Sequence, residues 1–189
     1  MAGWTIIRND VRMEHLIIKD TGYVAGVKFL INKPHEDERG SFTRIYCERE
    51  FEKIGFKTKQ INWSVTFGTG TFRGLHYQEN QAKIVRCISG AIFDVVADVR
   101  KESETRGQYF HTVLNDHEPN CALYIPAGCA HGFQCLTESA TIMYLASEFY
   151  SKETEQGVRW NDPTFSIHWP FYPPKLVSPK DQGFPSFEK

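Results

Sequence analysis

Short segments with the alternating apolar and polar residues of β-strands recur along most of this chain, separated by turns rich in glycine and proline. Ser41–Tyr46 and Lys59–Val65 alternate most clearly, and a period of two residues is typical of a strand with one buried face. A turn at Gly90 predicts a hairpin between Lys83–Ser89 and Ile92–Val99. The other predicted strands are Val11–Ile18, Val24–Ile31, Thr71–Gln78, Gln108–Leu114, Ala122–Ile125, His131–Cys135 and Thr141–Phe149. This pattern favours an all-β sandwich or barrel.

Helical spacing is confined to Glu50–Ile54, where Phe51 and Ile54 share a face and Gly55 ends the turn. His35–Gly40 is predicted as a charged turn. From Trp160 the strand pattern gives way to an aromatic and proline-rich tail, residues 160–189, which we expect to wrap around the β core. No linker divides the chain, so we expect one domain over residues 1–189, with residues 1–20 as an N-terminal extension that adds edge strands.

Charge and composition exclude several classes of protein. Lys and Arg number 22 against 23 Asp and Glu, and no basic stripe predicts a nucleic-acid partner. No apolar run is long enough to span a membrane, and the N-terminus lacks the pattern of a signal peptide. Five cysteines without a CxxC pair predict reduced thiols and a cytoplasmic protein.

The segment Thr71–Gln78 carries the first candidate for chemistry, His76. As a regular strand it would place His76 on one face with Gly74 and Gln78, and Arg73 on the other. The alternative is a core histidine with a hydrogen-bond partner. Lys59–Val65 poses a similar choice, because its polar row of Gln60, Asn62 and Ser64 suits either a solvated face or the wall of a pocket.

A metal site is disfavoured by the residues that a β-barrel pocket would hold here. His76, Gln78 and His131 form a poor ligand set, and the ammonium of Lys83 does not belong beside a cation. Phosphate-binding glycine motifs and nucleophile elbows are absent. His76, Lys83, His131 and Tyr144, with Asp94, Asp98 or Asp181 as carboxylate partners, suit proton transfer next to a carbonyl group without a cofactor.

Several motifs resemble the dTDP-4-dehydrorhamnose 3,5-epimerase family in order and spacing from about Glu38 to about Asp181. The motifs are Arg73-Gly-Leu-His-Tyr-Gln78, Lys83-Ile-Val-Arg-Cys87, Asp98-Val-Arg-Lys-Glu-Ser103, Tyr124-Ile-Pro-Ala-Gly-Cys-Ala-His-Gly-Phe133, Trp160-Asn-Asp-Pro163 and Leu176-Val-Ser-Pro-Lys-Asp181. The resemblance implies a cupin jelly roll (a double-stranded β-helix), a homodimer, no cofactor or metal, and a nucleotide-diphosphate sugar as substrate.

The same resemblance implies roles for particular residues. By position, His76 resembles the family's catalytic base, and Asp181 resembles the carboxylate that pairs with this base. Lys83 resembles the residue that stabilises the enolate, and Tyr144 resembles the proton donor. Tyr150 matches the aromatic residue that stacks on the nucleotide base. The other implied contacts with the nucleotide sugar are Arg39, Gln60, Asn62, Arg73, His131, Glu155 and Lys180.

Two positions depart from the family pattern. Arg44 stands where the family usually has a glutamate that reads thymine, and Leu145 follows Tyr144 where lysine is common. Arg44 either changes the preferred nucleotide, towards a cytidine or guanosine carrier, or turns outward. We therefore expect an epimerase of a dTDP-linked 4-keto-6-deoxyhexose that acts at C3, C5 or both. The alternatives are a mono-epimerase on a CDP- or GDP-linked sugar, a 3,4-ketoisomerase, and a non-catalytic cupin that binds a nucleotide sugar.

Overall fold

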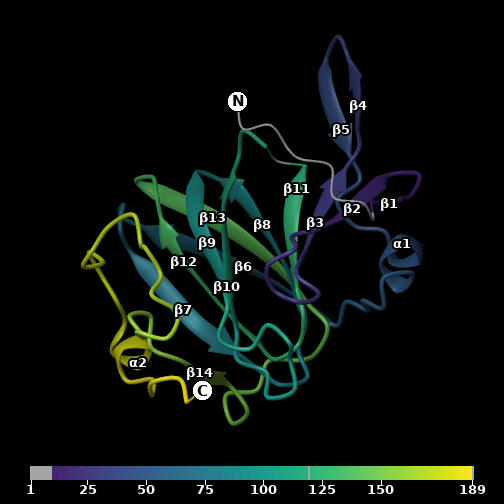
Figure 1. Ribbon diagram of the computed structural model, residues 1–189. Helices are drawn as coiled ribbons and strands as arrows, with labels where there is room; N and C mark the ends of the chain where they lie inside the picture. The colour runs from purple at the N-terminus through teal and green to yellow at the C-terminus, as the bar shows by residue number, and fades with distance from the viewer. Residues whose placement is uncertain (1–9, 119, 189) are drawn as a thin grey trace.

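The computed structural model describes residues 10–118 and 120–188, which form two facing antiparallel β-sheets (Figure 1). The larger sheet has seven strands, in the spatial order β1 (Val11–Arg12), β2 (Leu16–Asp20), β3 (Lys28–Asn32), β11 (Cys121–Ile125), β8 (Lys83–Ser89), β13 (Ser139–Ala146) and β6 (Gln60–Phe67). The smaller sheet has five, in the order β10 (Tyr109–Asn115), β9 (Ala91–Asp98), β12 (Cys129–Cys135), β7 (Phe72–Tyr77) and β14 (Gln156–Gly157). The predicted all-β class is confirmed.

Apolar side chains fill the space between the sheets. Val85 and Ile142 of the larger sheet are buried together with Val96 and Phe133 of the smaller one, as the two-residue period of each strand requires. The outer face of the smaller sheet is covered by the aromatic tail, where Trp169 packs edge-on against Phe72 with ring centroids 5.0 Å apart. The predicted C-terminal wrap is therefore present.

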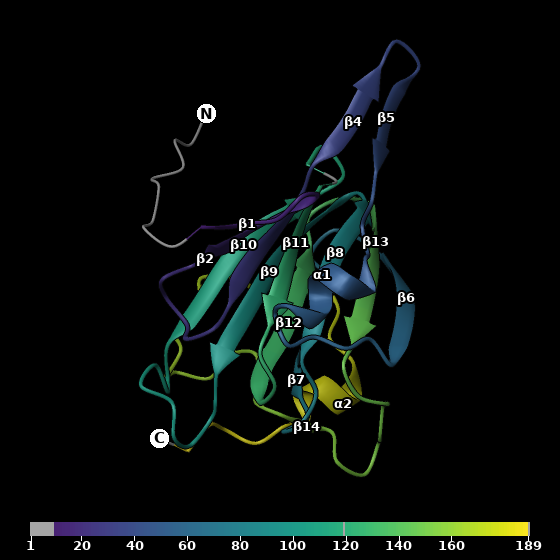
Figure 2. The same ribbon diagram turned by 90° about the vertical axis from the view of Figure 1, so that its right-hand side faces the viewer.

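Two short helices and a hairpin complete the fold. Helix α1 (Glu48–Glu52) begins two residues before the predicted helical turn and buries Phe51 against the outer face of the larger sheet. Helix α2 (Pro179–Gln182) lies in the C-terminal tail, where the sequence pattern did not predict a helix. Strands β4 (Pro34–Asp37) and β5 (Gly40–Thr43) form a hairpin that projects from the body of the molecule (Figure 2), so the predicted charged turn is confined to its tip.

The N-terminal region departs from the predicted strand over residues 11–18. A turn closed by the amide of Met13 and the carbonyl of Leu16, 2.7 Å apart, separates β1 from β2. Both strands extend one edge of the larger sheet, whereas residues 1–9 of the predicted extension lie outside the described residues. All five cysteines are unpaired, and within the described part of the chain no helix has the length and hydropathy of a membrane span.

Candidate active site

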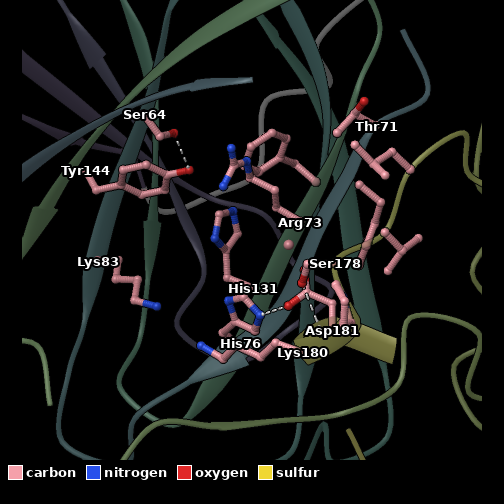
Figure 3. Close-up of a pocket in the computed structure, with 16 residues that line it drawn as sticks. Ser64, Thr71, Arg73, His76, Lys83, His131, Tyr144, Ser178, Lys180 and Asp181 are labelled. Atoms are coloured by element: carbon pink, nitrogen blue, oxygen red, sulfur yellow. Dashed lines mark hydrogen bonds and ion pairs between the residues drawn. The ribbon is translucent and has the colours of Figure 1, made fainter. Parts of the chain in front are cut away.

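A cavity of about 620 Å³ opens between the two sheets, beside the segment that leads into α2 (Figure 3). Polar side chains reach it from both sheets and from the C-terminal tail. They are Ser64 of β6, Arg73 and His76 of β7, Lys83 of β8, His131 of β12, Tyr144 of β13, Thr71, and Ser178, Lys180 and Asp181 of the tail. The cavity therefore gathers residues that are separated by up to 117 positions in the sequence (181 − 64).

An irregularity in β7 places Arg73 and His76 in the same cavity. His76 pairs with His131 and Arg73 pairs with Phe133, so β7 advances three residues while β12 advances two. One extra residue in a strand reverses the side of the sheet to which the following side chains point. The prediction that Arg73 and His76 lie on opposite faces is therefore wrong, and Leu75 is buried under the tail instead.

His76 is paired with a carboxylate that comes from the far end of the chain. Its Nε2 lies 2.7 Å from Asp181 Oδ1, and the backbone amide of Gly74 donates to the other oxygen of Asp181 at 3.3 Å. Burial alone would raise the pKa of Asp181, but its hydrogen bond and electrostatic interaction with His76 outweigh this effect and hold that pKa below its usual value. Asp181 therefore stays ionised and fixes the orientation of the imidazole.

The opposite edge of His76 faces a second polar group. Nδ1 lies 3.7 Å from Glu155 Oε1, and Glu155 accepts hydrogen bonds from the hydroxyl of Tyr150 at 2.9 Å and from the ammonium of Lys180. Burial would raise the pKa of Glu155, but these hydrogen bonds lower it overall. With Nε2 engaged by Asp181, Nδ1 is the ring nitrogen left to exchange a proton.

A second histidine–carboxylate pair lies in the adjacent strands. His131 Nε2 is 2.7 Å from Asp94 Oδ1, and both side chains are buried. His131 stands opposite His76 across the β7–β12 ladder. Of the three carboxylates that the sequence offered as partners, Asp94 and Asp181 thus pair with histidines, whereas Asp98 binds Arg100, Ser103 and Thr105 outside the cavity.

Lys83 and Tyr144 approach the cavity from the wall opposite Asp181 (Figure 3). Burial disfavours the ammonium of Lys83 and lowers its pKa, although the negative charge of Glu155 opposes this effect. The Tyr144 hydroxyl lies 3.3 Å from Ser64 Oγ, and burial raises the pKa of Tyr144 well above its usual value. At neutral pH, Tyr144 is therefore a protonated hydroxyl facing the cavity.

Comparison with known proteins identifies the family of this chain. The family described as dTDP-4-dehydrorhamnose 3,5-epimerase matches residues 22–189. The dTDP-4-dehydrorhamnose 3,5-epimerase of Salmonella typhimurium is 41% identical over 172 residues, which cover 88% of this chain and 93% of that protein. The chain belongs to the dTDP-4-dehydrorhamnose 3,5-epimerase family.

Solved structures of this epimerase family share the fold. NovW, a 4-keto-6-deoxy sugar epimerase from Streptomyces spheroides, superimposes with a TM-score of 0.83 at 37% identity, covering 93% of this chain and 89% of NovW. The dTDP-6-deoxy-D-glucose-3,5-epimerase of Legionella pneumophila, solved in complex with dTDP-4-keto-L-rhamnose, gives a TM-score of 0.84 at 32% identity over 92% of this chain and 93% of that one. The predicted cupin jelly roll is thereby confirmed.

Not every residue expected to contact the nucleotide sugar lies in this cavity. Arg39 sits at the tip of the β4–β5 hairpin, bound to Asp37 at 2.6 Å, and Arg44 follows the same hairpin with an exposed side chain. The hairpin extends away from α2 in both views (Figures 1 and 2). Within its own chain, this element does not bring either arginine to the cavity.

Gln60 and Asn62 lie near the cavity without lining it. Gln60 Nε2 donates to Asn62 Oδ1 at 2.7 Å, and Gln60 Oε1 accepts from the backbone amide of Tyr150 at 3.0 Å. Ser64, which continues the same polar row, is the member that lines the cavity and meets Tyr144. The row is therefore part of a pocket wall at Ser64, a residue that was not predicted from the motifs as part of the site.

Two residues that shape this cavity were not among the site residues that the resemblance implied. The hydroxyl of Ser178 accepts from the amide of Asp181 at 3.1 Å and so begins α2, and Ser-Pro before an acidic residue is a sequence signal for such a helix start. Phe184 contacts the ring of His76 without any sequence signal. Within residues 10–118 and 120–188, no three His, Cys, Asp or Glu side chains are grouped as a metal site.

Proposed function

We propose that this chain inverts C3 and C5 of a dTDP-linked 4-keto-6-deoxyglucose by proton transfer next to the C4 carbonyl. The observation that carries the proposal is the placement of the His76–Asp181 pair and the Tyr144 hydroxyl on different walls of one cavity. A base and an acid that face the same carbon from two sides can remove a proton from one face and return one to the other. The family membership supplies the substrate class.

In the proposed reaction His76 Nδ1 takes the proton from the carbon beside the carbonyl group. The electron pair of the C–H bond moves into the ring and leaves negative charge on the carbonyl oxygen as an enolate. Lys83 provides the positive charge that stabilises this oxygen, and a partly desolvated ammonium does so more strongly than one in water. Asp181 keeps Nε2 protonated and stabilises the imidazolium that forms.

Inversion is completed from the opposite face. The Tyr144 hydroxyl donates its proton to the carbon, the carbonyl group re-forms, and the phenolate recovers a proton from water while His76 returns its own to solvent. Because the pKa of Tyr144 is raised by burial, the hydroxyl is fully protonated before each cycle. The reaction is an isomerisation, so no redox partner or cofactor is required for its balance.

The nucleotide portion would occupy the cationic rim of the cavity. Arg73, whose Nε donates to Thr66 Oγ1 at 2.9 Å, and Lys180 would bind the diphosphate, and His131 would contact the sugar-phosphate portion. Tyr150 is 52% exposed beside Glu155 and would stack on the base. The Legionella relative has been solved with a dTDP sugar, which favours the same class of ligand here.

We further propose that the protein is a homodimer in which Arg39 and Arg44 act in the partner's cavity. The hairpin that carries them projects away from its own cavity, so a contact with substrate requires a second copy of the chain. The outward face of β6 supports such an assembly, because Ile61, Trp63 and Phe67 are 59%, 61% and 74% exposed at an edge of the larger sheet. Exposed apolar rows of this kind are typical of protein interfaces.

The proposal is tested with dTDP-4-keto-6-deoxyglucose in deuterated water, followed by NMR in the presence of EDTA. We expect deuterium at C3 and C5 and a product with both centres inverted, whereas His76→Asn should lose about 10²–10⁴-fold of the exchange rate. CDP- and GDP-linked sugars run in parallel should exchange more slowly. Absence of deuterium exchange in the wild type would indicate a binding protein. Exchange without inversion of either carbon would contradict the proposal that the chain is an epimerase.

A further inference from the structure

The C-terminal tail places an aromatic ring on the proposed base. Phe184 and His76 have ring centroids 5.3 Å apart and ring planes inclined at 60°, which is an edge-to-face contact. Such a contact restrains both rings, since each gains from one particular relative orientation. Phe184 follows Asp181 by three residues, so one short segment delivers both the carboxylate and the ring that contact His76.

A glycine on the neighbouring strand makes room for this ring. Gly157 pairs with His76 across the β14–β7 ladder. A Cβ atom at Gly157 would come within 2.7 Å of Cδ1 and Cε1 of Phe184, and within 2.7 Å of the carbonyl oxygen of Leu75. The ring of Phe184 therefore lies directly over the Gly157 backbone, in a slot that only the absence of a side chain leaves open.

The backbone around Phe184 is held on both sides. Before it, the amide of Gly183 donates to the carbonyl of Pro179 at 3.1 Å and closes α2. After it, the amide of Arg159 donates to the carbonyl of Pro185 at 3.0 Å. The amide of Phe187 donates to the buried carboxylate of Asp162 at 2.7 Å. The segment is thus anchored independently of the His76 contact, and the ring of Phe184 is presented from a fixed backbone.

We propose that Phe184 is a positioning residue for His76. Asp181 holds one edge of the imidazole through Nε2, but a single hydrogen bond leaves the ring free to rock about that contact. The Phe184 ring fixes the plane of the imidazole, keeps Nδ1 directed into the cavity, and excludes water from the hydrogen bond to Asp181. The apolar cover strengthens that hydrogen bond, because electrostatic interactions are stronger where water is excluded.

This inference rests on the proposed function of His76 as the base, and its test separates the two. In Phe184→Ala we expect kcat for deuterium exchange to fall about 10- to 100-fold with KM changed less than about threefold, because a misdirected base slows only the chemical step. Phe184→Tyr should retain most of the wild-type kcat. Phe184→Leu, which preserves bulk for folding, should fall between them.

A readout independent of activity is the state of the imidazole itself. We expect ¹⁵N NMR of histidine-labelled wild-type enzyme to show His76, assigned with His76→Asn among the seven histidines, as one Nε2–H tautomer. Phe184→Ala should show averaged tautomers. Phe187→Ala is the matched control, since this phenylalanine of the same segment packs on Phe165 and Arg106 and not on His76. It should lower thermal stability without changing the His76 signals.

Three outcomes would overturn the assignment of Phe184. They are an unchanged kcat in Phe184→Ala, a fall in kcat with an unaltered His76 tautomer, and a rise in KM that accounts for the whole loss. Full activity in His76→Asn would instead defeat the proposed function, and the tautomer measurement would still report whether Phe184 orients the ring. The two failures are therefore distinguishable.

Discussion

Lys83 carries its charge in surroundings that disfavour it. Burial lowers the pKa of its ammonium from the usual value of 10.5, and Glu155 compensates only in part. The charged form is present below the lowered pKa and is lost as the pH rises through it. In the proposed mechanism the same loss removes the stabilisation of the enolate, so the alkaline limb of activity reports Lys83.

We expect kcat of the wild type to decline at a pH below 10.5 as Lys83 loses its proton. Lys83→Arg should be less active at neutral pH but should lack this alkaline decline, because a guanidinium keeps its charge throughout the accessible range. Tyr144 does not interfere, since its pKa is raised far above that of the ammonium. The measurement is the pH profile of deuterium exchange, and an unchanged alkaline limb in Lys83→Arg would show that another group titrates there.

Replacing Asp181 with asparagine tests the orientation of the His76 imidazole, because the two side chains have nearly the same shape. In Asp181→Asn the amide can donate to Nε2 of His76, which moves the ring proton to Nδ1 and disables the base. We expect kcat to fall about 10²–10⁴-fold with little change in the free energy of unfolding. Measuring kcat together with denaturant unfolding distinguishes this from general damage, and a variant with wild-type kcat would argue against the dyad.

Tyr144 separates removal of the proton from its redelivery. Tyr144→Phe keeps the partly buried ring and loses only the hydroxyl that meets Ser64. His76 should still take up and return protons on its own face, so we expect substantial deuterium exchange with a loss of at least about 10²-fold in inverted product. NMR of both signals in one sample is decisive. Wild-type inversion in this variant would leave Tyr144 as a packing residue whose hydroxyl bonds Ser64.

At the scale of the elements, the close approach of the paired strands β7 and β12 positions the site. Gly74 has φ of +132°, and a Cβ atom there would lie 2.4 Å from the Cα of Gly132. The two glycines let the strands approach at the irregularity that turns Arg73 and His76 into the cavity. This close approach is thus both a packing feature and the origin of the arrangement of the site.

Gly74→Ala should therefore destabilise the protein by about 2–6 kcal/mol, from backbone strain and overpacking together. Gly40 is a matched control, because it has φ of +130° but a Cβ atom added there would meet none of the described residues within 4 Å. Gly40→Ala should cost only the backbone strain, about 1–3 kcal/mol. Denaturant unfolding of the two variants gives the difference, and equal losses would mean that the paired strands β7 and β12 tolerate the added methyl group.

At the scale of the whole molecule, one face of the protein is left apolar and exposed. The apolar residues of β6 alternate with its polar row and point outward, where α1 does not cover them. The strand therefore buries part of its polar side and exposes its apolar side. Combined with the projecting hairpin (Figure 2), this distribution favours a second copy of the chain as the missing cover.

Trp63→Glu should convert the proposed dimer to a monomer in sedimentation equilibrium, because a carboxylate placed in an apolar interface loses its hydration. The Tyr23→Glu control changes an aromatic residue of similar exposure, 63%, in the turn before β3, far along the sheet from β6. It should leave the mass unchanged.

Mixing His76→Asn with Arg44→Ala subunits should restore some activity if the hairpin serves the partner's cavity. A monomeric wild type, or no complementation, would contradict that assembly.

Local pattern was sufficient for much of this fold. The two-residue period predicted most strands to within a few residues, since alternation follows from burying one face of a sheet, and the sparse helical spacing excluded other classes. The motifs also allowed His76, Lys83, Tyr144 and Asp181 to be assigned by resemblance, and all four line one cavity.

The remaining features depended on contacts between distant segments. Asp181 lies 105 residues after His76, and no periodicity in the sequence encodes that approach. The extra residue in β7 arises from its register with β12, so alternation alone placed Arg73 on the wrong face. Likewise, tertiary packing decides that the apolar face of β6 points outward and that Phe184 lies over Gly157. Sequence alone determined which segments are extended and which chemical groups they carry. Register and packing between segments decided where those groups meet, because register and packing are set by the sum of many long-range contacts.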